Sequence, residues 1–252
     1  MRAFIYAAGR GLRLGPVQSR LPKILLELGG RTLLEWHVRR LREIGMGECH
    51  IVVGYKAEEV SRVMRSLEVE YGVSIRPIVN PDYTEGSVLS VAASLPQLQA
   101  ETEPVLIMDG DVLYGVEMLR RLIGSAHRSA LLIDRSYSTA DDDPVLVPVR
   151  DGRPFEFRKK WTGECDVVGE SIGFFKIDPA DMPALVEATL RRTNGAGRKE
   201  SYDEVLRDMV VEGRFGHEDV TGMHWAELDF VGDIEFAVAN VLPFIERNRP
   251  AS

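Results

Sequence analysis

Apolar runs alternate with helical patterns along the first 134 residues. Short runs rich in apolar and β-branched residues predict five strands, at 3–7, 50–53, 75–79, 105–108 and 130–134. Apolar residues at helical spacing predict helices between them, at 32–44, 58–67, 88–94 and 116–125. This alternation predicts an α/β fold with a mostly parallel sheet and helices on both faces.

The pattern changes after residue 134. The acidic string Asp141-Asp142-Asp143-Pro144 precedes short extended segments, predicted at 145–150, 154–159 and 171–177. The first two are joined by the turn Asp151-Gly152. Helices are predicted at 180–191 and 202–211, a strand at 223–228 and a last helix at 233–245. We expect a single domain over 1–252, with a mostly parallel half to about residue 134 and a smaller, partly antiparallel half from 135.

The predicted helix over 32–44 has two faces. Apolar side chains occupy one of them, at Leu33, Leu34, Val38 and Leu41. The other carries three arginines, which we interpret as a solvated surface: Arg39, Arg40 and Arg42. His37 lies in the same helix and His50 begins a strand, but neither has a sequence neighbour that suggests a catalytic triad.

Composition narrows the class of protein. A chain of 252 residues with 44% hydrophobic content can bury a sizeable core. Its net charge of −8 argues against a nucleic-acid partner. Cys49 and Cys165 lack metal-site spacing, the N-terminal residues do not resemble a signal peptide, and no apolar run is long enough to cross a bilayer. We therefore expect a soluble, cytoplasmic protein without a membrane partner.

The strongest chemical signal follows the first strand. Ala8-Gly9-Arg10-Gly11-Leu12-Arg13-Leu14 comes directly after it, and Leu21-Pro22-Lys23 closes the segment. Small residues let backbone N–H groups approach phosphate oxygens, while Arg13 and Lys23 supply positive charge. The pattern predicts a loop that holds a nucleoside triphosphate.

Other glycine-rich loops explain this segment less well. A dinucleotide-binding turn needs a third glycine where Leu14 stands. A P-loop needs a glycine, then four intervening residues, then Gly-Lys-Ser/Thr, and no such string occurs in the sequence. An ordinary strand-to-loop connection accounts for the two glycines, but not for Arg13 and Lys23 at these positions.

The string Ala7-Ala8-Gly9-Arg10-Gly11-Leu12-Arg13-Leu14, followed by Pro22-Lys23, resembles the signature of nucleotidyltransferases that make activated sugars and alcohols. Within that family the chain is most similar to small cytidylyltransferases acting on phosphocholine, inositol 1-phosphate or aminoethylphosphonate. The resemblance implies a Rossmann-like, GT-A-like sheet, with a nucleotide-binding half up to about residue 134 and an acceptor-binding half after it. It assigns catalysis to Arg13 and Lys23. It assigns nucleotide binding to the segment containing Ala7, Ala8, Gly9 and Gly11.

Carboxylates follow two of the predicted strands. Asp109-Gly110-Asp111 ends the strand at 105–108, at the kind of sheet edge where open α/β sheets bind ligands. A triphosphate requires a divalent cation, and Mg²⁺ prefers carboxylate oxygens. From the residues alone, Asp109 and Asp111 could equally begin a turn or cap the next helix. The resemblance assigns Asp111 to the metal.

Glu227-Leu228-Asp229 is the second acidic segment, and the resemblance identifies Asp229 as the second metal ligand. Glu227 is a weaker candidate, because it shares a face with Asp229 only if the strand continues regularly that far. It could still contact the metal through water. Asp233 is expected to be the N-cap of the last helix.

Residues 80–90 join a strand to a helix. Gly86 and Ser87 would form the N-terminus of that helix and offer free N–H donors to a ligand. The segment resembles the base-binding segment of cytidylyltransferases, which implies nucleotide binding by Gly86 and Ser87. The alternative for Ser87 is a purely structural helix cap.

The acceptor is expected to bind within residues 141–204. Lys159, in the run Arg158-Lys159-Lys160, aligns best with a family lysine that holds the acceptor's phosphate. Glu170 and Asp203 lie in blocks that resemble acceptor-binding segments, although the helix dipole alone would explain Asp203. Three aromatic residues are available if the acceptor is a choline derivative: Tyr114, Trp161 and Tyr202.

Together these features predict an Mg²⁺-dependent transfer of CMP from CTP to a small phosphorylated or phosphonate acceptor, with release of pyrophosphate. The acceptor's phosphate is already ionised at pH 7, so in-line attack needs no general base. Two alternatives stay open. One is a sugar-1-phosphate nucleotidyltransferase using UTP, dTTP or GTP, and the other is a catalytically silent nucleotide-binding subunit. A homodimer is also possible.

Overall fold

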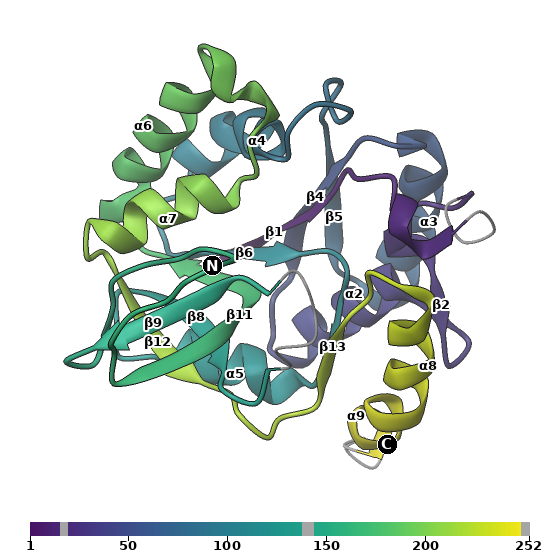
Figure 1. Cartoon of the computed structure of the whole chain (residues 1–252). Helices are drawn as coiled ribbons and strands as arrows, with labels where there is room; N and C mark the ends of the chain where they lie inside the picture. The colour runs from purple at the N-terminus through teal and green to yellow at the C-terminus, as the bar shows by residue number, and fades with distance from the viewer. Residues whose placement is uncertain (16–19, 138–143, 248–252) are drawn as a thin grey trace. The chain divides into compact units, whose positions relative to one another are not determined.

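The computed structural model describes residues 1–15, 20–137 and 144–247 (Figure 1). The string Asp141-Asp142-Asp143 lies outside these ranges. The chain forms two compact units. The terminal unit contains residues 2–81, 108–120 and 223–252, and the central unit contains residue 1, 82–107 and 121–222. Neither unit is one continuous stretch of sequence, because the chain leaves the terminal unit at residue 82 and returns to it at 108 and again at 223.

Three neighbouring parallel strands lie in the terminal unit and belong to a nine-stranded sheet. They are β1 (Arg2–Ala7), β4 (Glu48–Val53) and β5 (Ser74–Val79), with β4 paired to both of the others. Two helices connect them, α2 (Leu33–Glu43) and α3 (Ala57–Tyr71).

The strands and helices predicted between residues 3 and 79 are confirmed, with ends shifted by a few residues. β1 and β4 are buried along most of their length and read as continuous apolar runs, which is why the sequence pattern located them. β5 has exposed positions and was located from its apolar residues Ile75, Ile78 and Val79.

Short strands in the terminal unit escaped the sequence pattern. These are β2 (Glu27–Leu28) and β3 (Arg31–Thr32), which form a hairpin, and β7 (Val112–Tyr114), which pairs antiparallel with β13 (Trp225–Glu227), the strand predicted over 223–228. The helix predicted over 233–245 is in fact two helices, α8 (Val231–Asn240) and α9 (Leu242–Arg247). The break precedes Pro243, whose ring excludes the carbonyl of a preceding helical turn.

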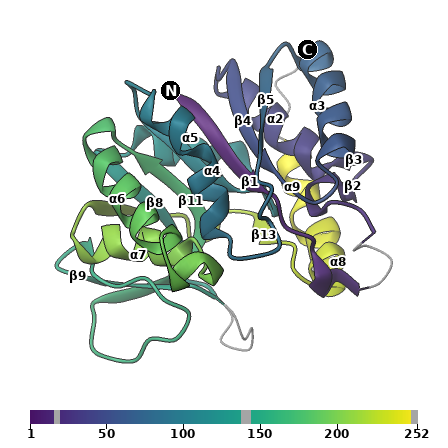
Figure 2. The same cartoon turned by 90° about the horizontal axis from the view of Figure 1, so that it is seen from above.

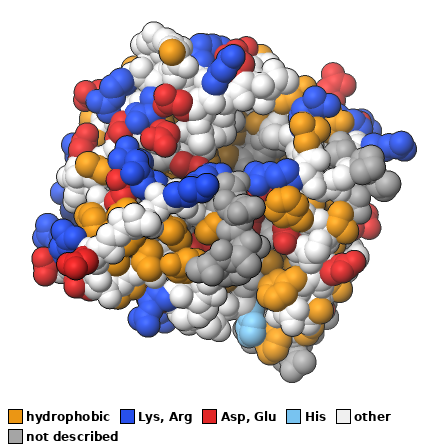
Figure 3. Space-filling model, in the orientation of Figure 1, with side chains coloured by type: hydrophobic (Ala, Val, Ile, Leu, Met, Phe, Trp, Pro, Cys, Tyr) orange, Lys and Arg blue, Asp and Glu red, His pale blue; other side chains and the backbone are white. Residues whose placement is uncertain are grey.

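The C-terminal helices pack on the terminal unit through an apolar cluster. It contains residues of α2, β13, α8 and α9, among them Trp36, Leu228, Ala237, Val241 and Ile245. Other apolar side chains of this segment remain exposed: Phe230, Val231, Phe236, Val238 and Phe244. Figure 3 shows hydrophobic side chains at the surface in the region of the C-terminal helices.

Arg40 is part of this packing, so the expectation of a solvated arginine surface is wrong for it. Its side chain is buried, and its guanidinium lies 5.2 Å from the Trp36 ring centroid. One Nη donates to the Glu43 carboxylate at 2.7 Å and the other donates to the Ile245 carbonyl at 3.0 Å. Sequence periodicity placed Arg40 on the polar face and gave no sign that α9 covers it.

The central unit contains the smaller, partly antiparallel section that the sequence predicts. Its strands β8 (Ser129–Asp134) and β9 (Leu146–Arg150) both pair antiparallel with β11 (Val167–Ile177). At its edges, β10 (Arg153–Pro154) pairs with β9 and β12 (Phe215–Asp219) pairs with β8. The strand predicted over 154–159 is reduced to β10 and one bridge between Arg158 and Leu146. The intervening Glu156 pairs with Arg207 instead, at 2.6 and 2.9 Å.

Helices α4 (Val88–Gln99), α6 (Met182–Thr193) and α7 (Asp203–Val211) also belong to the central unit and pack against one another (Figure 2). Two elements run across the unit boundaries, β6 (Val105–Asp109) and α5 (Val116–Gly124). The fold is a mixed, mostly parallel α/β fold, as the sequence predicts. Among the residues that the structure describes, no helix meets the length and hydropathy needed to cross a membrane.

The Arg40 contacts lead to a stability prediction. Arg40→Ala leaves the Ile245 carbonyl and the Glu43 carboxylate without this donor, so it should lower the free energy of unfolding by about 1–3 kcal/mol. Arg42→Ala, at an exposed position two residues along the same helix, should change it by no more than about 0.5 kcal/mol. Urea unfolding of both variants checks this, and equal values would contradict the role given to Arg40.

Candidate functional site: a cation and carboxylate cluster in the terminal unit

The loop after β1 is shaped by two glycines with different roles. Gly11 has φ of +60°, and a Cβ there would lie 3.4 Å from the Cβ of Lys23, so the turn itself favours glycine. Gly9 is exposed, and a Cβ there would meet no atom within 4 Å. The Ala8 carbonyl accepts the backbone N–H of Tyr55 at 3.0 Å, which ties the loop to the end of β4. Packing within the protein therefore explains Gly11 but not Gly9.

Lys23 begins a short 3₁₀ helix (Lys23–Leu25) that is anchored by the buried side chains of Ile24 and Leu25. Its Nζ donates to Asp111 Oδ2 at 2.7 Å and to Asp229 Oδ1 at 2.5 Å. Burial lowers the pKa of the Lys23 amine, but the charges of both aspartates and the hydrogen bonds to them outweigh burial and raise it. Lys23 is therefore a permanent cation between two carboxylates.

Arg13 provides the second cation. Its Nη1 lies 2.9 Å from Asp229 Oδ2, and its guanidinium lies 5.8 Å from the centroid of the Phe230 ring. The structure thus brings together Arg13, Lys23, Asp111 and Asp229, which the sequence selected from three distant segments of the chain.

Glu227 joins this group. Among the described residues, Asp111, Glu227 and Asp229 form a cluster in which one carboxylate oxygen from each lies within 4.8 Å of the others. From the alternation of side chains along a single strand, Glu227 was expected to be a weaker candidate for a metal ligand than Asp229. In the structure, Glu227 is the last residue of β13 and pairs with Val112, next to Asp111, so the pairing of two strands places it. That pairing partner, β7, was not predicted.

The turn that carries Asp111 is held from two sides. Gly110 donates its N–H to the Tyr6 carbonyl at 3.0 Å, and a Cβ at Gly110 would lie only 2.8 Å from that oxygen. On the other side, His37 Nε2 lies 3.3 Å from the Gly110 carbonyl, and His37 Nδ1 lies 3.3 Å from the Tyr114 hydroxyl. Burial lowers the pKa of the His37 imidazole to about 4, so His37 is neutral at pH 7.

Asp233 has a different role from the one expected. Helix α8 begins at Val231, so Asp233 is its third residue and not its N-cap. Its carboxylate reaches back to accept the backbone N–H groups of Asp229, at 2.8 Å, and Phe230, at 2.6 Å. An acid at the third helical position commonly does this. Asp233 thereby fixes the backbone of Asp229.

The donors expected at Gly86 are already used within the central unit. The Gly86 N–H donates to the Arg198 carbonyl at 2.9 Å, and a Cβ there would lie 2.3 Å from the Glu200 carbonyl oxygen. The expectation of a free Gly86 donor is therefore wrong for this structure. Ser87 makes no side-chain capping bond to its own helix, and its Oγ instead accepts the Tyr202 N–H at 2.9 Å.

The residues expected to bind the acceptor lie in the central unit. Ser201 Oγ donates to the Asp203 carboxylate at 2.7 Å and lies 3.2 Å from Ser87 Oγ, so Ser87 and Asp203 are neighbours. Lys159 is exposed, and Glu170 is half-buried in β11 opposite Asp134. Their binding roles stay predictions.

The aromatic side chains named for a choline acceptor differ in accessibility. Tyr114 is 2% exposed and contacts His37, and Tyr202 is 7% exposed, so neither presents an open ring face in this structure. Trp161 is half-buried and packs edge-on against Phe155, with ring centroids 6.0 Å apart. The expectation of three available aromatic residues is therefore wrong for Tyr114 and Tyr202.

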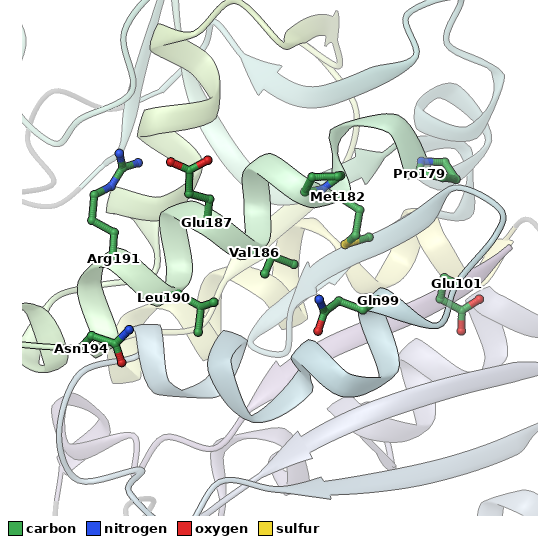
Figure 4. A pocket seen from close by; sticks show the side chains of 10 residues that line it. Gln99, Glu101, Pro179, Met182, Val186, Glu187, Leu190, Arg191 and Asn194 are labelled. Carbon is green, nitrogen blue, oxygen red and sulfur yellow. The ribbon is translucent and has the colours of Figure 1, made fainter.

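A cavity of about 750 Å³ lies in the central unit, where the end of α4 meets α6 (Figure 4). Its lining includes Gln99, Met182, Val186, Leu190 and Asn194. It contains none of the site residues that the sequence predicts.

A glycine-containing loop with two cations, facing strand-end carboxylates, is an arrangement suited to binding phosphates and a divalent cation. The chain belongs to the family described as MobA-like NTP transferase domain, whose family model matches residues 3–167.

Two curated relatives are similar to nearly all of this chain. The chain is 30% identical over 269 residues to CMP-5'-(3-aminopropyl)phosphonate synthase of Streptomyces rubellomurinus, covering 99% of this chain and 40% of the relative. It is 31% identical to the bifunctional IPC transferase and DIPP synthase of Rubrobacter xylanophilus, covering 95% of this chain and 52% of that protein. The chain thus spans about half the length, or less, of these two relatives.

The inositol-1-phosphate CTP transferase from T. maritima has the same fold. It superposes with a TM-score of 0.78 at 19% identity, over 99% of this chain and 98% of that one.

The crowding around Gly110 leads to a second stability prediction. Gly110→Ala should lower the free energy of unfolding by about 1–3 kcal/mol, because the new Cβ overlaps the Tyr6 carbonyl and the turn must shift. Gly124→Ala is the control, since a Cβ there meets nothing within 4 Å and the change should stay within about 0.5 kcal/mol. Urea unfolding measures both. A Gly110→Ala variant as stable as the control would show that the turn is not fixed by this contact.

Proposed function

We propose that this chain transfers CMP from CTP to the phosphate or phosphonate group of a small acceptor and releases pyrophosphate. The observation that carries the proposal is the cluster in which Lys23 and Arg13 face the carboxylates of Asp111, Glu227 and Asp229. The choice of CTP is supported by a relative named for its CMP product and by a similar fold named as a CTP transferase.

The proposed reaction is a single displacement. An oxygen of the acceptor's phosphate or phosphonate forms a bond to the α-phosphorus of CTP, and the bond from that phosphorus to the bridging oxygen of pyrophosphate breaks. The attacking oxygen is already ionised at pH 7, so no side chain has to remove a proton from it. Catalysis then consists of positioning and charge stabilisation.

Arg13, Lys23 and the loop backbone supply this stabilisation. The two side chains carry the charge that offsets the phosphates. No atom of the described residues lies within 4 Å of the place where a Cβ of residue 9 would stand, and backbone N–H groups at such a position can approach phosphate oxygens closely. In this proposal, Gly9 is small to leave space for the nucleotide.

The donor set fits Mg²⁺, which binds carboxylate oxygens at about 2.0–2.1 Å. Oxygens on opposite sides of such an ion lie about 4 Å apart, so small rotations of Asp111, Glu227 and Asp229 would suffice to share one ion. When bound, Mg²⁺ would supply neutralisation of the triphosphate charge. Asp111 and Asp229 are the proposed direct ligands, with Glu227 beside them.

The test of the function is turnover with each triphosphate separately. CTP with Mg²⁺ and an acceptor set of inositol 1-phosphate, phosphocholine and an aminoalkylphosphonate should release pyrophosphate and give a CMP-linked product by mass spectrometry. Asp111→Asn should lower kcat/KM by a factor on the order of a hundred or more. Asp109→Asn, on the same turn but outside the carboxylate cluster, should cost far less.

Three results would contradict this proposal. Turnover with UTP, dTTP or GTP but not with CTP would make the chain a different nucleotidyltransferase. Unchanged turnover in Asp111→Asn would remove the proposed metal role. Absence of turnover with all four triphosphates and every acceptor tested would favour the silent nucleotide-binding subunit.

The position of Lys23 leads to a separate prediction about metal affinity. Its ammonium occupies the same carboxylate oxygens that a divalent cation would use, so the two compete. Lys23→Met should therefore bind Mn²⁺ alone about three- to tenfold more tightly, although it turns over more slowly. Lys56→Met, which removes an ion pair with Glu59 elsewhere in the terminal unit, is the control and should leave Mn²⁺ affinity unchanged. Calorimetric titration with Mn²⁺ measures this, and weaker binding by Lys23→Met would contradict the competition.

A further inference from the structure

His37 is a polar residue in the middle of the buried face of α2. Its side chain is 0% exposed, and Leu33, Leu34 and Leu41 of the same helix are equally buried. Burying an imidazole costs free energy unless its nitrogen atoms find hydrogen-bond partners. Both nitrogens of His37 have one, and both partners belong to the segment 110–114 that carries Asp111.

The partners define the protonation state of the ring. The Gly110 carbonyl can only accept a hydrogen bond, so Nε2 must carry the proton and donate it. Nδ1 is then an acceptor, and the Tyr114 hydroxyl donates to it. A neutral imidazole satisfies both contacts at once, whereas an apolar side chain of similar size satisfies neither.

These two contacts lie at the two ends of the 110–114 segment. This segment carries Asp111, and its pairing with β13 places Glu227 opposite Val112. Gly110 immediately precedes Asp111. Tyr114 ends β7 and pairs with Trp225 at the start of β13, whose last residue is Glu227. The backbone between them is also fixed, since the Leu228 N–H donates to the Asp111 carbonyl at 3.0 Å.

We infer that His37 is a positioning residue, whose imidazole holds the 110–114 segment so that Asp111 stays in register with Glu227 and Asp229. This inference rests on the proposed metal-binding role of the carboxylate cluster. His37 itself contacts neither the carboxylate oxygens nor, in this account, the substrate. Its effect reaches the metal through the backbone of Gly110 and through the pairing of β7 with β13.

A purely structural role for His37 makes different predictions. The His37 and Tyr114 rings lie 5.4 Å apart at 49°, a contact that phenylalanine would largely retain. If packing were the whole role, His37→Phe would keep full metal affinity in the folded protein, and glutamine would be no better a replacement than phenylalanine.

The experiment compares three variants of the whole chain: His37→Phe, His37→Gln and Leu41→Ala. Glutamine retains one donor and one acceptor, and phenylalanine has neither. Leu41→Ala removes buried volume from the same helix but leaves the His37 imidazole unchanged, so it controls for general destabilisation. Mn²⁺ binding without nucleotide, measured by electron paramagnetic resonance, is the primary readout. Thermal unfolding and kcat are measured alongside.

His37→Phe should weaken Mn²⁺ binding about tenfold or more, the range seen when groups that orient metal ligands are removed. His37→Gln should restore it to within about threefold of the unsubstituted chain. Leu41→Ala should lower the melting temperature but leave Mn²⁺ affinity unchanged at a temperature where the protein is folded.

The inference is overturned if His37→Phe binds Mn²⁺ normally, if glutamine gives no rescue, or if Leu41→Ala weakens binding equally. Asp111→Asn separates this failure from failure of the proposed function. If Asp111→Asn abolishes Mn²⁺ binding while His37→Phe does not affect it, only the positioning role is lost. If Asp111→Asn binds Mn²⁺ normally, the proposed metal site fails and the positioning role fails with it.

Discussion

Repulsion among three carboxylates is the constraint on which this site depends. Two like charges 4 Å apart repel by about 4 kcal/mol at an effective dielectric of about 20, and Asp111, Glu227 and Asp229 lie within 4.8 Å of one another. The ammonium of Lys23 and the guanidinium of Arg13 form ion pairs with the two aspartates and offset this repulsion. Both cations come from the loop after β1. The same charges that stabilise the acids are therefore available to a polyanionic nucleotide.

The α/β class and its helices and strands could largely be predicted from the sequence, because buried strands and amphipathic helices leave strong periodic signals. A strand of two or three residues is too short for a reliable periodic signal, and β7 was missed for this reason. The points at which the chain passes from one unit to the other could not be predicted either, because the sequence around residues 82 and 223 has no feature typical of a domain boundary. Arg40 shows a further limit of periodicity, which gives the polar face of a helix but not what later packs on it.

The site could be predicted where its residues belong to one motif or to a family resemblance. Arg13, Lys23, Asp111 and Asp229 were selected in this way, and they meet in the structure. Glu227 was underrated because its place depends on strand pairing and not on its own neighbours. His37 could have been singled out from the sequence, because it is a polar residue on an otherwise apolar helix face. The hydrogen bond from the Gly86 N–H to the Arg198 carbonyl could not be predicted, because it depends on a tertiary contact between distant segments.

The most direct test of the central claim is anomalous X-ray scattering from crystals of the chain grown with CTP and Mn²⁺. The account predicts a manganese peak in contact with the carboxylates of Asp111 and Asp229, with Lys23 and Arg13 directed to the phosphates. A peak bound by other residues, or a triphosphate held away from Arg13 and Lys23, would contradict it.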